Sequence, residues 1–155
     1  MSVAFRRESD EEHKEPRFEL PIPPGPNLVT ARGLALISAK VAHFRALTDT
    51  AADEEARALA ERDLRYWQTR ETTAEVTAPA TGESVAIGTR VAFTLNGEAR
   101  EIEIVGHDEG DPAAGRIAFS APLARAMIGA EAGDTADFGG KTDAIEILSI
   151  ASVSD

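Results

Sequence analysis

The sequence predicts an α+β protein in which an N-terminal antiparallel helical hairpin, packed as a coiled coil, precedes a small antiparallel sheet domain with one short helix. Three observations predict this class. Apolar residues recur every three or four positions between residues 30 and 73, as in helices that share a buried seam. After Pro79 apolar and polar residues alternate, as in half-buried strands. Asn96-Gly97 is typical of a tight turn between two strands.

Composition limits the classes of function. The chain has 155 residues, of which 43% are hydrophobic, with a formal net charge of -11 and no cysteine. This charge excludes nucleic-acid binding through the bulk surface and suits a basic protein partner or metal ions. The lack of cysteine excludes disulfides, zinc-thiolate sites and cysteine nucleophiles. Neither a secretory signal nor a membrane-length apolar run is visible, so we expect a cytoplasmic protein. We also expect it to be a monomer.

Residues 1–28 are expected to form a disordered arm that is acidic and rich in proline. Pro21, Pro23, Pro24 and Pro26 disfavour a helix and favour an extended, solvated path. The alternative is a peptide segment that docks on a partner.

The helical hairpin is expected over residues 29–78. Its first helix runs from Thr30, a suitable N-cap, to about Leu47, and its second from about Ala52 to Thr73. A short polar turn between them makes the helices antiparallel. The seam residues are Leu34, Ile37, Val41 and Phe44 in the first helix and Ala60, Leu64 and Trp67 in the second.

Acidic residues gather at the tip of this hairpin. Asp49, Asp53, Glu54 and Glu55 could recruit Mg²⁺, because hard cations prefer carboxylate oxygens. They could equally cap the second helix, since acids in a first turn complement the helix dipole. Both interpretations remain open from the sequence.

The remaining charged residues suggest no catalytic site. Arg57, Arg62, Arg65 and Arg70 follow the second helix, where they could pair with neighbours such as Glu61 or face RNA. The three histidines are far apart in the sequence and fit no metal or Ser/His/Asp pattern.

Residues 79–155 are expected to hold about five antiparallel strands and one short helix. The strands are predicted at 85–95, 98–105, 116–119, 135–138 and 143–153. In the stretch from 106 to 134, Pro122 suits the first turn of a helix, Ser120 can serve as its N-cap, and Gly129 can end it.

This stretch resembles the C-terminal domain of the bacterial Gre transcript-cleavage factors. The matching residues are Gly106, Asp108, Glu109, Ile117, Ser120, Pro122, Leu123, Ala124, Arg125, Ile128, Gly129, Gly133 and Asp134. The resemblance implies an FKBP-like fold for residues 79–155 and binding to RNA polymerase at its secondary channel, with the hairpin pointing inward. Nucleic acid would be met only through the polymerase. The protein would not be an enzyme, and at most would share the polymerase's Mg²⁺ and stimulate its RNA cleavage.

The resemblance also implies a docking surface. Ser120, Pro122, Leu123 and Arg125 would lie on an exposed lip that contacts the rim of the channel. We expect Leu123 to be its apolar anchor, since such anchors often dominate interface energy.

The hairpin departs from the family pattern. It is shorter, and its tip lacks the Asp-x-x-Glu-Asn motif, so we expect weak or no stimulation of transcript cleavage.

Two other functions are possible. A first alternative is a protein-binding regulator resembling the regulator of nucleoside diphosphate kinase, without tip chemistry. A second is a peptidyl-prolyl isomerase, which would need an aromatic-lined pocket, whereas the sheet domain has only Phe93, Phe119 and Phe138.

Overall fold

The computed structural model describes residues 19–153, so most of the predicted arm lies outside the described residues. The described chain forms two compact units. Residues 19–24 and 37–73 form a hairpin unit, and residues 25–36 and 74–153 form a sheet unit. These limits differ from the boundaries predicted at residues 28 and 78, because both ends of the hairpin belong to the sheet unit. No helix in the described part has both the length and the apolar character that crossing a membrane requires.

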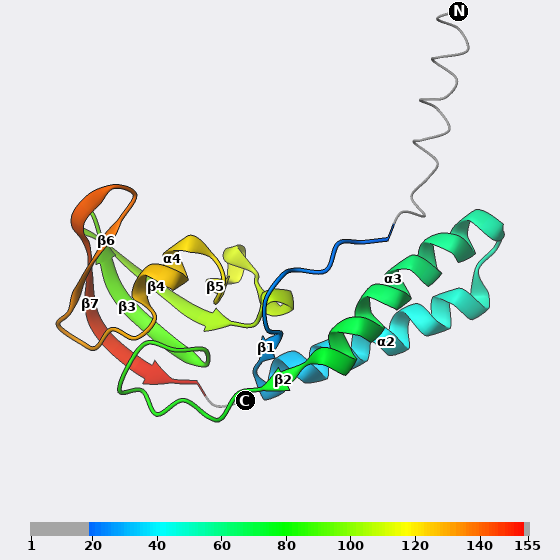
Figure 1. Ribbon diagram of the computed structural model, residues 1–155, viewed down its shortest axis with the longest axis horizontal. Coiled ribbons are helices and arrows are strands. Elements are labelled where there is room, and N and C mark those ends of the chain that lie inside the picture. The colour runs from blue at the N-terminus through cyan, green and yellow to red at the C-terminus, as the bar shows by residue number, and fades with distance from the viewer. Residues whose placement is uncertain (1–18, 154–155) are drawn as a thin grey trace, which may run out of the picture. The chain divides into compact units, whose positions relative to one another are not determined.

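The two long helices are those predicted from the apolar seam. Helix α2 (Ala31–Thr50) and helix α3 (Glu54–Thr73) run side by side in opposite directions (Figure 1). Ile37, Val41 and Ala60 are buried, as the seam predicts. The cap was also predicted correctly, because the Gly33 N–H donates to Thr30 Oγ1 at 3.0 Å.

Helix α2 continues three residues beyond its predicted end at Leu47. The hydroxyl of Thr48 donates to the Phe44 carbonyl at 2.8 Å, and that of Thr50 to the Ala46 carbonyl at 3.1 Å. These bonds occupy hydroxyls that could otherwise compete with helical hydrogen bonding, so two threonines are accommodated in the last turns.

Two very short strands that the sequence did not predict join the ends of the hairpin. Strand β1 (Leu28–Val29) pairs in parallel with β2 (Glu75–Val76). The N–H of Glu75 donates to the Asn27 carbonyl at 2.8 Å, and that of Thr77 to the Val29 carbonyl at 2.9 Å. Two residues are too few to show the period of a strand, so the sequence carried no signal for this pair.

The main sheet has five strands in the order β5-β4-β3-β7-β6. They are β3 (Thr89–Leu95), β4 (Glu98–Val105), β5 (Arg116–Ala118), β6 (Thr135–Phe138) and β7 (Lys141–Ser152). Three of the four pairings are antiparallel, but β4 and β5 are parallel. The prediction of an entirely antiparallel sheet was therefore wrong at this edge.

The parallel pairing follows from the segment between β4 and β5. Parallel neighbours need a crossover, and here two single 3₁₀ turns, η1 (His107–Glu109) and η2 (Pro112–Ala114), return the chain to the start of β5. Gly106 opens this segment, and a Cβ there would lie 2.7 Å from the Leu28 carbonyl oxygen. Glycine thus allows β1 to pass directly against the end of β4.

The apolar core of the sheet unit lies between the sheet and helix α4 (Pro122–Met127). Phe93, Ile104, Met127 and Ile145 are fully buried in it. The buried residues of this core all fall between Val85 and Ile147. The α+β class is confirmed, and the core sets the position of α4 and of the turns on either side of it.

Candidate functional site

Helix α4 carries the lip to which the sequence assigned partner binding. Pro122 occupies its first turn as predicted, but Ala121 is the N-cap and no side chain caps the helix. The prediction of Ser120 as the cap was wrong, because Ala121 is the last extended residue before the helix, at φ -69° and ψ 148°. Gly129 follows the helix at φ +94°, and its N–H donates to the Val85 carbonyl at 2.8 Å.

The four lip residues differ in exposure. Ser120, Pro122 and Arg125 are exposed, whereas Leu123 is half-buried and packs against the apolar core. Leu123 is thus less exposed than predicted, because it packs against the apolar core of the sheet unit. Its role as the anchor for a partner stays a prediction. Ile128, just after the helix, is the apolar residue left 42% exposed.

The acidic residues at the hairpin tip are all exposed. Asp53 Oδ1 accepts a hydrogen bond of 2.8 Å from the Ala56 N–H, which makes Asp53 the cap of α3. Glu54 and Glu55 occupy the first turn of α3, and Asp49 lies in the last turn of α2. Within residues 19–153, no group of three or more His, Asp or Glu side chains could hold a metal ion. Recruitment of Mg²⁺ by these four carboxylates stays a prediction.

A network of two buried carboxylates and partly exposed arginines holds the start of α2 against the rest of the sheet unit, and the sequence did not predict it. Thr30 Oγ1 donates to the Glu109 carboxylate at 2.8 Å, while Arg32 Nη2 donates to Glu103 Oε2 at 2.6 Å. Glu103 and Glu109 are 9% and 7% exposed, which is rare for carboxylates unless they are paired. Arg32 Nε lies 3.6 Å from Glu109 Oε2, so this arginine serves both acids.

Two further arginines complete the network around Glu103. Arg116 Nε and Arg90 Nη2 lie 3.8 and 4.0 Å from Glu103 Oε1. Burial acts to lower the pKa of Arg32, but its hydrogen bond to Glu103 and the charges of both acids outweigh this, so the pKa is raised. Glu103 occupies a polar position in the alternation Glu101-Ile102-Glu103-Ile104, which in a half-buried strand would place it on the solvated face. The arginines that surround it come from distant parts of the sequence, which is why no local pattern could have found the network.

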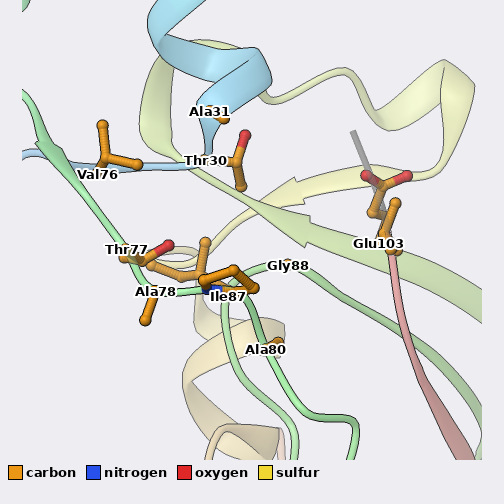
Figure 2. Close-up of a pocket in the computed structure, with 11 residues that line it drawn as sticks. Thr30, Ala31, Val76, Thr77, Ala78, Ala80, Ile87, Gly88 and Glu103 are labelled. Carbon is orange, nitrogen blue, oxygen red and sulfur yellow. The ribbon is translucent and has the colours of Figure 1, made fainter.

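A pocket of about 320 Å³ lies beside this network (Figure 2). Its walls are mainly aliphatic and include Val76, Ala78 and Ile87. The Thr30 hydroxyl that lines it is bonded to Glu109, and the Glu103 carboxylate to Arg32. The lining contains no aromatic residue, unlike the pocket that a peptidyl-prolyl isomerase would need.

In the hairpin unit, one ion pair joins the segment before β1 to helix α3. Arg65 donates from Nη2 to Glu19 Oε2 at 2.7 Å and from Nε to Glu19 Oε1 at 3.0 Å. These hydrogen bonds, together with the positive charges of Arg65 and Arg62, lower the pKa of Glu19 despite partial desolvation. From the sequence, Arg65 could pair with a neighbour in its own helix or face RNA, whereas the observed partner lies 46 residues away.

Comparison with known proteins gives the family. The model of the C-terminal domain of GreA/GreB transcription elongation factors matches residues 73–154. The chain is 38% identical over 74 residues to transcription elongation factor GreA of Rhizobium etli, covering 45% of this chain and 47% of that protein. It is 47% identical over 55 residues to GreA of Allorhizobium ampelinum, covering 34% and 35%. The chain thus matches about half the length of the Rhizobium etli protein and about a third of that of the Allorhizobium ampelinum protein.

Among solved structures, GreA factor homolog 1 of Thermus thermophilus is 14% identical, with a TM-score of 0.38 over 83% of this chain and 100% of that one. The family model covers more than half of the chain, including all five strands of the main sheet and helix α4. The chain therefore belongs to the GreA/GreB family of transcription elongation factors.

Proposed function

We propose that this protein is a Gre-type regulator of transcription elongation that binds RNA polymerase at the secondary channel. The sheet unit docks on the rim of the channel through the lip of α4, and the hairpin points inward. The protein is not itself an enzyme, and it acts in the bacterial cytoplasm, where its partner works. The observation that carries the proposal is the family match over residues 73–154, which includes the whole lip.

The lip has the properties of a contact surface. Pro122 and Arg125 are exposed on a helix that is itself fixed to the core through Ala124 and Met127, both fully buried. A rigid support of this kind reduces the entropy that binding must overcome. The sheet unit can therefore offer these side chains to a partner without rearranging.

We further propose that the protein stimulates transcript cleavage weakly or not at all. Catalysis depends on geometry within about an ångström, and misplacement by that much can cost ~10²-fold in rate. At this tip Asp53 is engaged as a helix cap, and Glu54 and Glu55 follow it on successive helical positions, about 100° apart around the axis. Any Mg²⁺ near the tip would have to be held by the polymerase.

Polymerase binding is tested at Pro122. Pro122→Glu places a charge on the lip at an exposed first-turn position that tolerates it. We expect affinity for purified RNA polymerase to fall about tenfold, or roughly 1.4 kcal/mol. Ala99→Glu, at an exposed position of β4, is the matched control and should bind normally. Failure of the unaltered protein to bind polymerase would refute the proposed function.

The cleavage proposal is tested on a stalled, backtracked polymerase complex with Mg²⁺. We expect little release of short 3′ RNA fragments on addition of the protein. A triple variant, Asp49→Asn, Asp53→Asn and Glu54→Gln, removes the charges, while the asparagine introduced in place of Asp53 retains the ability to cap α3. Rapid fragment release by the parent protein that is lost in this variant would show that the tip does support cleavage.

A further inference from the structure

Residues 19–24, the segment that precedes β1 (blue in Figure 1), lie against helix α3, and we call them the strap. The strap reads Glu-Leu-Pro-Ile-Pro-Pro and belongs with α3 to the hairpin unit. A space of about 450 Å³ between the strap and α3 is lined by Glu19, Leu20, Ile22, Arg65, Tyr66, Gln68, Thr69 and Thr72. Arg65, Thr69 and Thr72 are three or four positions apart, so the strap covers one face of the helix and packs on it loosely.

The polar contacts that hold the strap are few. Its one hydrogen-bonded contact with other described residues is the pair between Glu19 and Arg65. The side chain of Glu19 is 61% exposed and that of Arg65 is 49% exposed, and ion pairs at this exposure contribute little to stability. No backbone hydrogen bond joins residues 19–24 to another described residue. A segment with so few contacts opens locally at low cost.

The apolar side chains of the strap are only partly covered. Leu20 and Pro23 are half-buried, whereas Ile22 is 45% exposed. Because proline favours extended conformations in any case, the strap keeps a similar backbone whether or not it lies on α3. Neither burial nor a special backbone conformation therefore ties the strap strongly to the helix.

The chain becomes firmly held only after the strap. The Asn27 carbonyl accepts the hydrogen bond from the Glu75 N–H, and Asn27 and Val29 are 6% and 1% exposed. Gly25 lies between the strap and this anchor at φ +86°, with no atom within 4 Å of the place that a Cβ would occupy. Since glycine changes its backbone angles at little cost, the strap can turn about Gly25 while β1 stays paired with β2.

Departure of the strap would uncover a face of α3. Arg65 would lose the carboxylate that it now binds with two nitrogens, and the side chains of Thr69 and Thr72 would become more accessible. The covered face belongs to the hairpin, which under the proposed function is the part that points into the channel of the polymerase. A partner that contacts this face must first displace the strap.

We propose that the strap is an autoinhibitory cover: closed on α3, it keeps this face from RNA polymerase, and it swings away about Gly25 when the hairpin binds. The inference rests on the proposed function and adds a means of regulating it. A ligand that binds only the open form has an apparent affinity reduced by the fraction of open molecules. The position of the strap therefore sets how tightly the protein binds polymerase.

The first test locks the strap in place. The chain has no cysteine, so Glu19→Cys with Arg65→Cys supplies a single pair of thiols that a bismaleimide can join. We expect the linked protein to bind RNA polymerase at least tenfold more weakly than the parent. The matched control is the same double variant with each cysteine blocked by N-ethylmaleimide. It lacks the ion pair and leaves the strap unlinked, so it should bind at least as tightly as the parent.

The second test loosens the strap. Glu19→Gln removes the charge that pairs with Arg65, so NMR order parameters of the Leu20 and Ile22 amides should fall and polymerase binding should become a few-fold tighter. Glu98→Gln is the matched control, because Glu98 also pairs through an exposed carboxylate with an arginine that is 49% exposed. This control makes the same change of charge in the sheet unit and should bind as the parent does.

The outcomes distinguish this inference from the proposed function. If the parent protein does not bind polymerase, the proposed function fails. If the parent binds and the linked protein binds equally well or more tightly, the strap does not cover a contact, and the inference is wrong although the proposed function stands. Loosened amides in Glu19→Gln without tighter binding would contradict the inference in the same way.

Discussion

Gly33 and Glu109 meet closely at the start of helix α2. A Cβ on residue 33 would lie 2.9 Å from Glu109 Cδ and 3.0 Å from its Oε2. The carboxylate could retreat only by giving up its hydrogen bond from Thr30, which is 2.8 Å long and buried. Glycine lowers the helix propensity at position 33, but it leaves the space that the buried Glu109 carboxylate occupies.

We predict that Gly33→Ala destabilises the protein although alanine favours helices. The substitution gains about 1 kcal/mol of helix propensity, whereas disturbing a buried, charged hydrogen bond costs about 1.5–3 kcal/mol. A net loss of about 1 kcal/mol should appear in urea unfolding. In a Glu109→Ala background the clash is gone, so Gly33→Ala should become stabilising; destabilisation in both backgrounds would reject this explanation.

The Glu19–Arg65 pair makes a prediction about pH. The pKa of Glu19 is lowered, chiefly by its hydrogen bond from Arg65, so the carboxylate stays ionised to a lower pH than in the unfolded chain. The contribution of this pair to folding stability is present at pH values above the ordinary glutamate pKa. It is lost as the pH falls through the lowered pKa of Glu19. Carboxyl chemical shifts followed by NMR should give a Glu19 midpoint that rises in Arg65→Gln. An unchanged midpoint in that variant would contradict the assigned cause.

At the scale of elements, the sequence predicted the helices and strands that are long enough to show a regular spacing of apolar residues. Helices α2 and α3 each run for 20 residues with a continuous apolar seam, so both were predicted with errors of only a few residues at their ends. Strands β1 and β2 have two residues each and exist only because they pair with one another. The parallel direction of β5 depends on where the crossover leads the chain, which local alternation does not encode.

For the candidate site, too, the sequence predicted the features that depend on local residues and missed those that depend on distant ones. Pro122 and Gly129 could be placed from the local chemistry of helix starts and stops. The partial burial of Leu123 depends on which face of a short helix meets the core, and the sequence of that helix alone does not determine this. The Glu103 network joins residues about 71 positions apart, for which a single sequence has no signal.

Two apolar residues, one in the first turn of α4 and one just after its end, should respond differently to truncation. Leu123→Ala removes side-chain packing against the core and should cost about 1–2 kcal/mol, somewhat less than for a fully buried leucine. Ile128→Ala, at a position that is 42% exposed, should stay within about 0.5 kcal/mol of the parent. Urea unfolding of both variants checks this. A larger loss at Ile128 than at Leu123 would reverse the assignment of core and surface.

At the scale of the whole molecule, the sheet unit draws on residues from both sides of the hairpin. Its apolar core lies entirely within residues 80–155, which supports independent folding of that fragment. Yet Val29, which is 1% exposed, and the network partners Thr30 and Arg32 come from before the hairpin. A fragment that starts at residue 80 keeps the core and loses these contacts.

We therefore predict that residues 80–155 fold alone but are less stable than the sheet unit of the full chain. Dispersed amide signals in an NMR spectrum of the fragment should demonstrate folding, and collapsed signals would reject the prediction that the fragment folds alone.

Glu109→Gln separates the stability that comes from the sheet domain itself from the stability that the start of α2 adds. In the full chain it weakens the charged contacts to Thr30 and Arg32 and should cost about 1 kcal/mol or more. In the fragment both partners are absent and the side chain is freed to solvent, so the same substitution should be nearly neutral in urea unfolding. An equal loss of stability in the full chain and in the fragment would mean that Glu109 stabilises the sheet domain through contacts within residues 80–155. The start of α2 would then add no stability through this residue.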